Sequence, residues 1–150
     1  MARAINLAME NVRSGKGGPF AAVVVKESNI LGEGTNVVTS TNDPTAHAEI
    51  VAIRAACKKL RSFELTNCEI YANCEPCPMC LGAIYWARPA RIYFAARSAD
   101  AAKIGFDDAF IYRQLKKSAK ERKIPTAQLM RAEALEVFHA WESKLDKIKY

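Results

Sequence analysis

The chain has 150 residues, 50% of them hydrophobic, and a formal net charge of +6. This length supports one sizeable core and is short for two, so we predict a single domain over residues 1–150. No apolar run approaches the roughly 18 residues that a membrane span requires, which excludes an integral membrane protein. Five cysteines without an export signal favour metal binding over a disulfide framework and indicate a cytoplasmic protein.

In chain order, the helical spacing of apolar residues first predicts an amphipathic helix over residues 1–12 that ends near Gly15. Strands are expected next over residues 20–26 and 30–38, and the short polar link between them makes the pair a hairpin. The residues at 43–45 are typical helix starters, so we expect a second helix to follow them.

Strands and helices alternate through the rest of the predicted structure. The strands are expected at 68–72, 91–95 and 127–132, and the helices at 76–86, 107–123 and 134–149. This alternation implies parallel neighbouring strands with helices on both faces of the sheet. The predicted fold class is therefore α/β.

A basic run over residues 113–123 is the feature that suggests nucleic-acid binding. No aromatic residue on which bases could stack is interleaved with these charges, so we interpret the run as a solvated helix face. We expect no nucleic acid or membrane as a partner. The alternative is a nucleic-acid-binding protein that uses a metal structurally, and its binding would collapse as the salt concentration rises.

The most informative motif is His47-Ala48-Glu49, followed further along the chain by Pro76-Cys77-Pro78-Met79-Cys80, a pattern typical of zinc deaminases. The two cysteines of the second segment are three residues apart at the start of a helix that proline is suited to begin, so both sulfurs can face one point. Free backbone N–H groups and the helix dipole favour thiolates there. The histidine opens a different helix and would complete three protein ligands for Zn²⁺.

Three protein ligands leave a fourth zinc position open for water, whose pKa falls to about 7, so that hydroxide is available at neutral pH. Glu49 is predicted to take a proton from that water and to deliver protons to a ring nitrogen and to the departing amine. The alternative is a closed structural site with Cys74 as the fourth ligand. Pro76 argues against it, because the residue before a proline is extended, which places Cys74 at the end of the preceding strand.

Beyond this motif the sequence resembles the cytidine deaminase superfamily and, within it, the bacterial guanine deaminases. The resemblance runs nearly end to end and is carried by residues 17–20, 40–49, 74–86 and 105–108 and by the C-terminal Tyr150. It implies a cytidine deaminase-like fold, which is a three-layer α/β/α sandwich on a mixed five-stranded sheet. It also implies a homodimer with swapped C-terminal segments.

The resemblance further implies five residues that hold a purine. Phe20 would stack on the ring, Asn36 would hydrogen-bond to its polar edge, and Asp108 would accept a ring N–H. Trp86 would wall the pocket, and Tyr150 would close it from the partner chain. Without the resemblance, each of them would be interpreted as a core residue, a cap, a helix start or a frayed terminus.

The reaction that this family implies is hydrolysis of guanine to xanthine and ammonia, with hydroxide attacking the amino-bearing ring carbon at the zinc and Glu49 as the proton shuttle. Asp108 favours a free base, because an attached ribose would remove the imidazole-ring N–H that the carboxylate accepts. The closest alternative is a deaminase of guanosine or another nucleoside, and a further one is a tRNA adenosine deaminase. Glu142 is either a second proton shuttle or a solvated charge.

Overall fold

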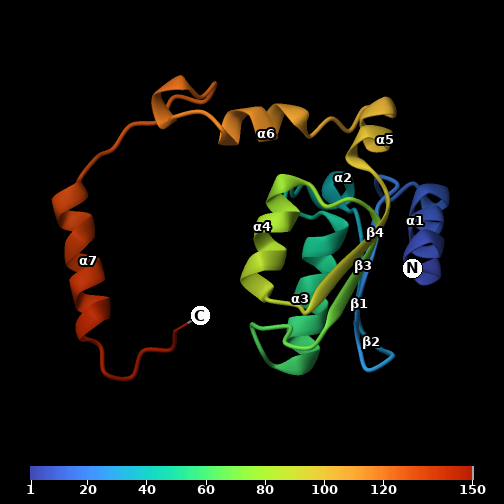
Figure 1. Ribbon diagram of the computed structural model, residues 1–150, viewed down its shortest axis with the longest axis horizontal. Helices are drawn as coiled ribbons and strands as arrows, with labels where there is room; N and C mark the ends of the chain where they lie inside the picture. Colours follow the sequence, from blue (N-terminus) through green and yellow to red (C-terminus); the bar gives the residue numbers. More distant parts are fainter. Residues whose placement is uncertain (150) are drawn as a thin grey trace. The chain divides into compact units, whose positions relative to one another are not determined.

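The computed structural model describes residues 1–149 and divides after Phe110 into two compact parts (Figure 1). The first part contains the sheet, and the second is helical. The single domain predicted over residues 1–150 stays a prediction. Tyr150, for which a pocket-closing role is predicted, lies outside the described residues.

A mixed sheet in the order β2-β1-β3-β4 forms the centre of the first part. β1 pairs antiparallel with β2 and β3, whereas β3 pairs parallel with β4, so the predicted hairpin and the predicted parallel neighbours both occur. The strands are β1 (Ala21–Lys26), β2 (Asn29–Thr35), β3 (Glu69–Cys74) and β4 (Arg91–Ala96).

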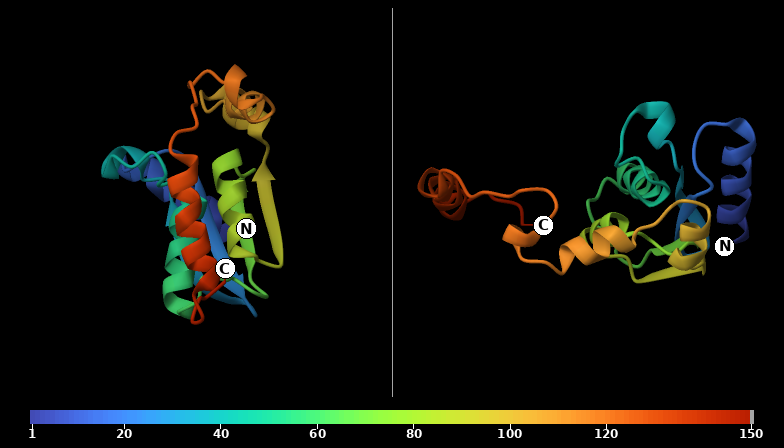
Figure 2. Two further views of the ribbon diagram at one scale, coloured as in Figure 1. Left: turned by 90° about the vertical axis from the view of Figure 1, so that its left-hand side faces the viewer. Right: turned by 90° about the horizontal axis from the view of Figure 1, so that it is seen from above.

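Helices cover both faces of this sheet, with α1 on one side and α3 and α4 on the other (Figures 1 and 2). α1 ends as predicted at Gly15, whose φ of 68° is the left-handed conformation that glycine adopts without strain. The helices of the first part are α1 (Ala2–Ser14), α2 (Val38–Thr41), α3 (Ala48–Leu60), α4 (Pro78–Ala87) and α5 (Ser98–Lys103). The result is a three-layer α/β/α arrangement.

Alternate residues of β1 supply the two cores between these layers. Ala22 and Val24 are buried in the main cluster together with the apolar face of α3, whereas Ala21 and Val23 pack with α1. Successive side chains of a strand point to opposite faces, so a continuous apolar run is what a strand covered on both faces requires. The valine-rich sequence of β1 therefore specifies a central strand.

Two glycines of β2 allow α3 to approach the sheet closely. A Cβ at Gly32 would lie 2.4 Å from the carbonyl oxygen of Ala52, and one at Gly34 would lie 2.2 Å from that of Ala48. Any side chain at these positions would push α3 away from the sheet. Because α3 begins next to His47, this close packing helps to fix the position of the His47-Ala48-Glu49 motif.

The second part differs most from the sequence-based expectation. The helix expected over 107–123 is α6 (Ala109–Leu115), which begins in the first part, followed by a single 3₁₀ turn, η1 (Ala119–Glu121). The strand expected over 127–132 is not formed: residues 127–130 belong to no helix or strand, and α7 (Arg131–Ser143) begins directly after them. The sheet of residues 1–149 accordingly has four strands and not the five predicted. A lone extended segment has no ladder to join, and the second part contains no other strand in its described residues.

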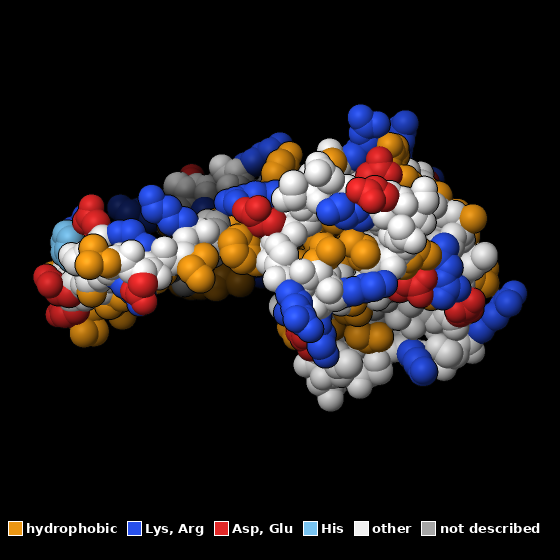
Figure 3. All heavy atoms as spheres, turned by 90° about the horizontal axis from the view of Figure 1, so that it is seen from below, with side chains coloured by type: hydrophobic (Ala, Val, Ile, Leu, Met, Phe, Trp, Pro, Cys, Tyr) orange, Lys and Arg blue, Asp and Glu red, His pale blue; other side chains and the backbone are white. Residues whose placement is uncertain are grey.

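Helix α7 carries an exposed apolar face. Val137, Phe138 and Trp141 are all exposed, and Figure 3 shows hydrophobic side chains along the surface of this part. The helix is shorter than predicted, since it ends at Ser143 and not at 149. Among residues 1–149, no helix is long and apolar enough to cross a bilayer.

Candidate active site

The side chains of His47, Cys77 and Cys80 converge on one point at the N-terminal ends of two helices. His47 is the N-cap of α3 and Cys77 the N-cap of α4, with Pro78 as the first helical residue, as the sequence predicts. The Nδ1 atom of His47 lies 3.5 Å from each of the two sulfurs. One donor atom from each residue lies within 4.8 Å of the other two, a spacing that a single metal ion can bridge.

Hydrogen bonds in this cluster favour a thiolate at Cys77. The backbone N–H of Cys80 donates to the Cys77 sulfur at 3.5 Å. Hydrogen bonding from the Cys80 side chain, together with that from His47, lowers the pKa of Cys77 to about 4. The same contact with Cys77, and then burial, raises the pKa of Cys80, and the bond to Cys77 raises the pKa of His47. The thiolate is the form of cysteine that binds metals.

Two sulfurs and one imidazole are a donor set that zinc prefers, and three protein ligands are typical of catalytic zinc sites. These residues therefore fit a zinc ion, which they would hold between α3 and α4. Among the described residues, Cys74 is not part of this cluster. It ends β3, and its thiol donates instead to the carbonyl oxygen of Arg97 at 3.8 Å.

Glu49 stands beside the cluster in the first turn of α3. Its side chain is 8% exposed, and its Oε2 atom accepts a hydrogen bond from the Cys80 sulfur at 3.4 Å. Burial raises the pKa of the Glu49 carboxyl, which brings this group closer to a pH at which it can both accept and release a proton.

A cavity of about 230 Å³ opens onto this cluster within the first part. His47, Glu49 and Cys77 line it together with three of the predicted purine-binding residues, Phe20, Asn36 and Asp108. Residues that are far apart in the sequence thus meet around one space. Its volume suits a small planar molecule.

The two neighbouring aspartates at the start of α6 have different partners. Asp107 accepts a hydrogen bond from the backbone N–H of Ala109 at 2.8 Å and so caps the helix. Asp108 lines the cavity, and burial together with the charge of Cys77 raises its pKa. The helix-start interpretation of the sequence fits Asp107, whereas Asp108 is available to a ligand.

Trp86 does not share this location. It lies near the C-terminal end of α4, its side chain is 66% exposed, and it is not one of the residues that line the cavity. Its role as a pocket wall stays a prediction. Glu142, the other carboxylate singled out in the sequence, lies on α7 with its side chain 82% exposed.

The cavity also has walls that the sequence-based interpretation missed. The ring of Phe106 meets that of Phe20 edge to face with centroids 4.8 Å apart, a geometry that aromatic pairs favour. Thr39, Asn73 and Glu75 line the cavity as well. Phe106 lies in the Gly105–Asp108 segment that the family resemblance already marks, so a signal for it was present. For Asn73 no local signal exists.

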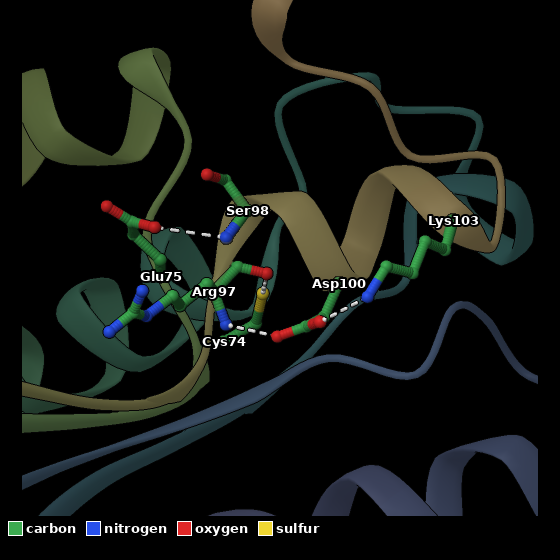
Figure 4. A network of polar contacts seen from close by, with 6 residues as sticks. All are labelled: Cys74, Glu75, Arg97, Ser98, Asp100 and Lys103. Carbon is green, nitrogen blue, oxygen red and sulfur yellow. Dashed lines mark hydrogen bonds and ion pairs between the residues drawn. The ribbon is translucent and has the colours of Figure 1, made fainter.

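Polar contacts anchor the segment that leads from β3 to the group of candidate zinc ligands, His47, Cys77 and Cys80, which we call the metal cluster (Figure 4). The backbone N–H of Glu75 donates to Ala96 at 2.9 Å, and the Glu75 carboxylate accepts from the N–H of Ser98 at 3.0 Å. At the start of α5, the carboxylate of Asp100 accepts hydrogen bonds from the backbone N–H of Arg97 at 3.2 Å and from the Lys103 side chain at 3.1 Å. The turn between β4 and α5 thereby holds the chain just before Cys77.

Comparisons with known proteins agree with this site. Residues 1–96 match the zinc-binding region of cytidine and deoxycytidylate deaminases. The chain is 55% identical over 148 residues to the guanine deaminase of Bacillus subtilis, covering 99% of this chain and 95% of that protein. It is 43% identical over 96 residues to a tRNA-specific adenosine deaminase of Haemophilus influenzae, covering 60% of this chain and 56% of that one.

Solved structures give the same grouping. The X-ray structure of the Bacillus subtilis guanine deaminase matches with a TM-score of 0.97 and 54% identity, over 99% of this chain and 95% of that one. A structure in complex with 2,6-diaminopurine has a TM-score of 0.67 and 37% identity, over 71% of this chain and 60% of that one. A structure in complex with 8-azaguanine has a TM-score of 0.67 and 36% identity, over 71% of this chain and 62% of that one.

The chain therefore belongs to the zinc-binding cytidine and deoxycytidylate deaminase family and has its fold. The predicted family is confirmed. Within it, the near-complete match places the chain among the guanine deaminases, which are hydrolases.

Proposed function

We propose that this protein hydrolyses guanine to xanthine and ammonia in the cavity beside His47, Cys77 and Cys80. The observation that carries the proposal is the meeting of this metal cluster with the buried Glu49 and with polar groups suited to a purine edge, in one 230 Å³ space. The 99% coverage of the match to a guanine deaminase supports guanine over other aminated rings.

Each residue of the cluster has a defined task in this reaction. His47, Cys77 and Cys80 would hold zinc, which when bound makes hydroxide available from water at neutral pH. Glu49 accepts the proton that water gives up when its oxygen bonds to the amino-bearing ring carbon. Glu49 passes this proton to a ring nitrogen. It then takes the second proton from the oxygen now bonded to the ring carbon and delivers it to the amine, so that the carbon–nitrogen bond breaks, a ring carbonyl forms and ammonia leaves.

Three other residues orient the base. Phe20 stacks on the purine, backed by the edge of Phe106. Asn36 hydrogen-bonds to the polar edge of the ring, and its amide is restrained in the cavity wall because its Oδ1 atom accepts a hydrogen bond from the N–H of Val38 at 3.3 Å. Asp108 accepts the imidazole-ring N–H, a contact that a ribose on that nitrogen would remove.

Ammonia release measured on guanine, guanosine, adenine, cytosine, cytidine and tRNA tests this function. We expect guanine to be preferred to adenine by roughly a thousandfold or more, because polar groups that match one ring edge are left unpaired by the other. Comparable rates on the two bases would contradict the proposal. Faster turnover of guanosine would assign a nucleoside deaminase instead, and turnover of tRNA a base-editing enzyme.

We further propose that the working form is a homodimer with exchanged C-terminal segments. Two features of the separate parts support it: β4 is an edge strand with one side unpaired in the described residues, and α7 has an exposed apolar face. An extended segment at 127–130 from a second chain would add the fifth strand of the sheet at β4. Tyr150 of that chain would close the cavity.

Removal of residues 147–150 tests the closing segment. We expect turnover and guanine affinity to fall while zinc content and the unfolding temperature stay close to those of the full chain, because a lid excludes water without holding the core. Mixing the truncated chain with a Glu49→Gln chain should restore activity, since one site then combines an intact Glu49 with a donated tail. Full activity of the truncated protein, or no rescue after verified subunit exchange, would contradict this.

A further inference from the structure

Asn11 of α1 forms a hydrogen-bonded link between two walls of the cavity without lining the cavity itself. Its side chain is buried, at 4% exposure, although α1 lies against the sheet face opposite to α3 and α4. The Nδ2 atom of Asn11 donates to the carbonyl oxygen of Gly18 and to that of Asn36, each at 2.9 Å. Both hydrogens of this amide are therefore committed to backbone next to the purine-binding residues.

These two bonds close a ring with the backbone of Phe20. The N–H of Phe20 donates to Gly18 at 2.9 Å, and the N–H of Asn36 donates to the carbonyl oxygen of Phe20 at 2.9 Å. Phe20 and Asn36 are thus joined to each other directly, and a second time through Asn11. Any shift of one wall of the cavity changes the other.

A second asparagine holds Phe20 from both sides. The Nδ2 atom of Asn73 donates to the carbonyl oxygen of Pro19 at 2.9 Å, and its Oδ1 atom accepts from the N–H of Ala21 at 2.8 Å. Asn73 comes from β3, whose next residues lead to the metal cluster. This amide therefore fixes the distance between the aromatic wall and the strand that precedes Cys77.

The packing of Gly17 points to the same place independently. A Cβ on Gly17 would lie 1.9 Å from the carbonyl oxygen of Asn36, closer than any non-bonded contact allows. Gly17 is thus required for the Asn36 backbone to sit where Asn11 holds it. The hydrogen bond from Asn11 and the close approach of Gly17 thus both involve the carbonyl oxygen of Asn36.

We propose that Asn11 and Asn73 are positioning residues that set the affinity of this enzyme for its purine, by fixing where Phe20 and Asn36 stand. The inference rests on the proposed function, because it assigns these two residues to the binding of guanine. Neither asparagine hydrogen-bonds to His47, Cys77 or Cys80 in the described contacts, so zinc binding should not depend on them.

The test replaces each asparagine by alanine and measures KM and kcat for guanine, the Kd of 8-azaguanine, zinc content and the unfolding temperature. We expect KM and the 8-azaguanine Kd to rise roughly tenfold or more. This is the loss of affinity expected when Phe20 and Asn36 shift enough to weaken the binding of the purine by about the free energy of one hydrogen bond. We expect kcat to fall by less than about threefold, because Glu49 and the metal cluster keep their places. Zinc content should not change.

Leu7→Ala is the matched control for lost stability. Leu7 is buried in α1 within the same apolar cluster as Ala21 and Val23, but its side chain has no hydrogen-bonding group and does not line the cavity. This variant should lower the unfolding temperature while leaving KM and the 8-azaguanine Kd unchanged. If Asn11→Ala does not fold, Asn73→Ala carries the same test: Asn73 is half-buried and lines the cavity, but both polar atoms of its amide bond to the backbone of Pro19 and Ala21.

Gly17→Ala provides an independent route to the same displacement. It should raise KM as the asparagine variants do, whereas Gly82→Ala on the exposed side of α4, where a Cβ meets nothing, should not. Wild-type protein that neither deaminates guanine nor binds 8-azaguanine would refute the proposed function. Wild-type protein that does both, together with asparagine variants whose KM and Kd match those of Leu7→Ala, would refute the positioning role alone.

Discussion

Replacing Glu49 by glutamine should lower guanine turnover by roughly a hundredfold or more, while zinc stays bound and the purine still enters the cavity. Glutamine keeps the size and the hydrogen-bonding reach of the side chain, but it cannot accept a proton from water and pass it on. The expected result is a lower kcat at an 8-azaguanine affinity close to that of the wild type. Steady-state ammonia release, metal analysis and a direct binding measurement report the three quantities.

The matched control for this change is Glu64→Gln. Glu64 is also a glutamate, but it pairs with Arg88 and does not line the cavity. Its loss should leave kcat and KM at wild-type values. Near-normal turnover by a zinc-loaded Glu49→Gln protein would contradict the shuttle role and would direct the search to another proton acceptor, such as Glu75 or Asp108, which also line the cavity.

The metal cluster could be predicted from the sequence because the rules that place its members are local. Cys77 and Cys80 share one helical turn, and Pro78 fixes where that turn begins. Pro76 keeps the residue before it extended and so places Cys74 in the strand and away from the cluster, as the structure shows. Glu49 follows from its two-residue distance to His47 at the start of α3.

Contacts between distant segments are what the sequence does not reveal. Asn11 reaches a carbonyl 25 positions away, and Asn73 reaches one 54 positions away. An asparagine in a helix or strand gives no sign of which backbone it will hold, since that depends on how α1 and β3 pack against the loop before β1. The glycine-rich turn at 15–18 is visible in the sequence, but the close approach of Gly17 to the carbonyl oxygen of Asn36 is not.

The prediction of secondary structure in the C-terminal region was wrong for a different reason. Residues 127–132 have a strand-like pattern, yet a strand forms only where a partner edge satisfies its N–H and C=O groups. In the structure α7 begins at Arg131 instead, and the basic run at 113–123 divides between the end of α6 and η1. A pattern whose partner belongs to another chain, as the proposed dimer requires, cannot be resolved from one chain's periodicity.

Loss of zinc is the second large effect, and it separates a catalytic site with three ligands from a closed site with four. Substitution of His47, Cys77 or Cys80 by alanine should remove zinc and with it all guanine turnover, because two remaining donors bind the ion far more weakly. Cys74→Ala should keep one zinc per chain. Its sulfur donates to the Arg97 carbonyl at 3.8 Å, so a structural contact is lost there and not a metal ligand.

Metal analysis of the purified proteins gives the zinc content, and thermal unfolding with and without a chelator provides an independent readout. A bound ion stabilises only the folded state, so a chelator should lower the unfolding temperature of the wild type and of Cys74→Ala. It should leave that of His47→Ala unchanged, because no ion is there to remove. A Cys74→Ala protein without zinc, beside a His47→Ala protein that retains it, would reverse the ligand assignment. If Cys74→Ala and His47→Ala both lose zinc, the ion has four protein ligands, its fourth position is taken by sulfur and closed to water, and hydrolysis at this cluster is excluded.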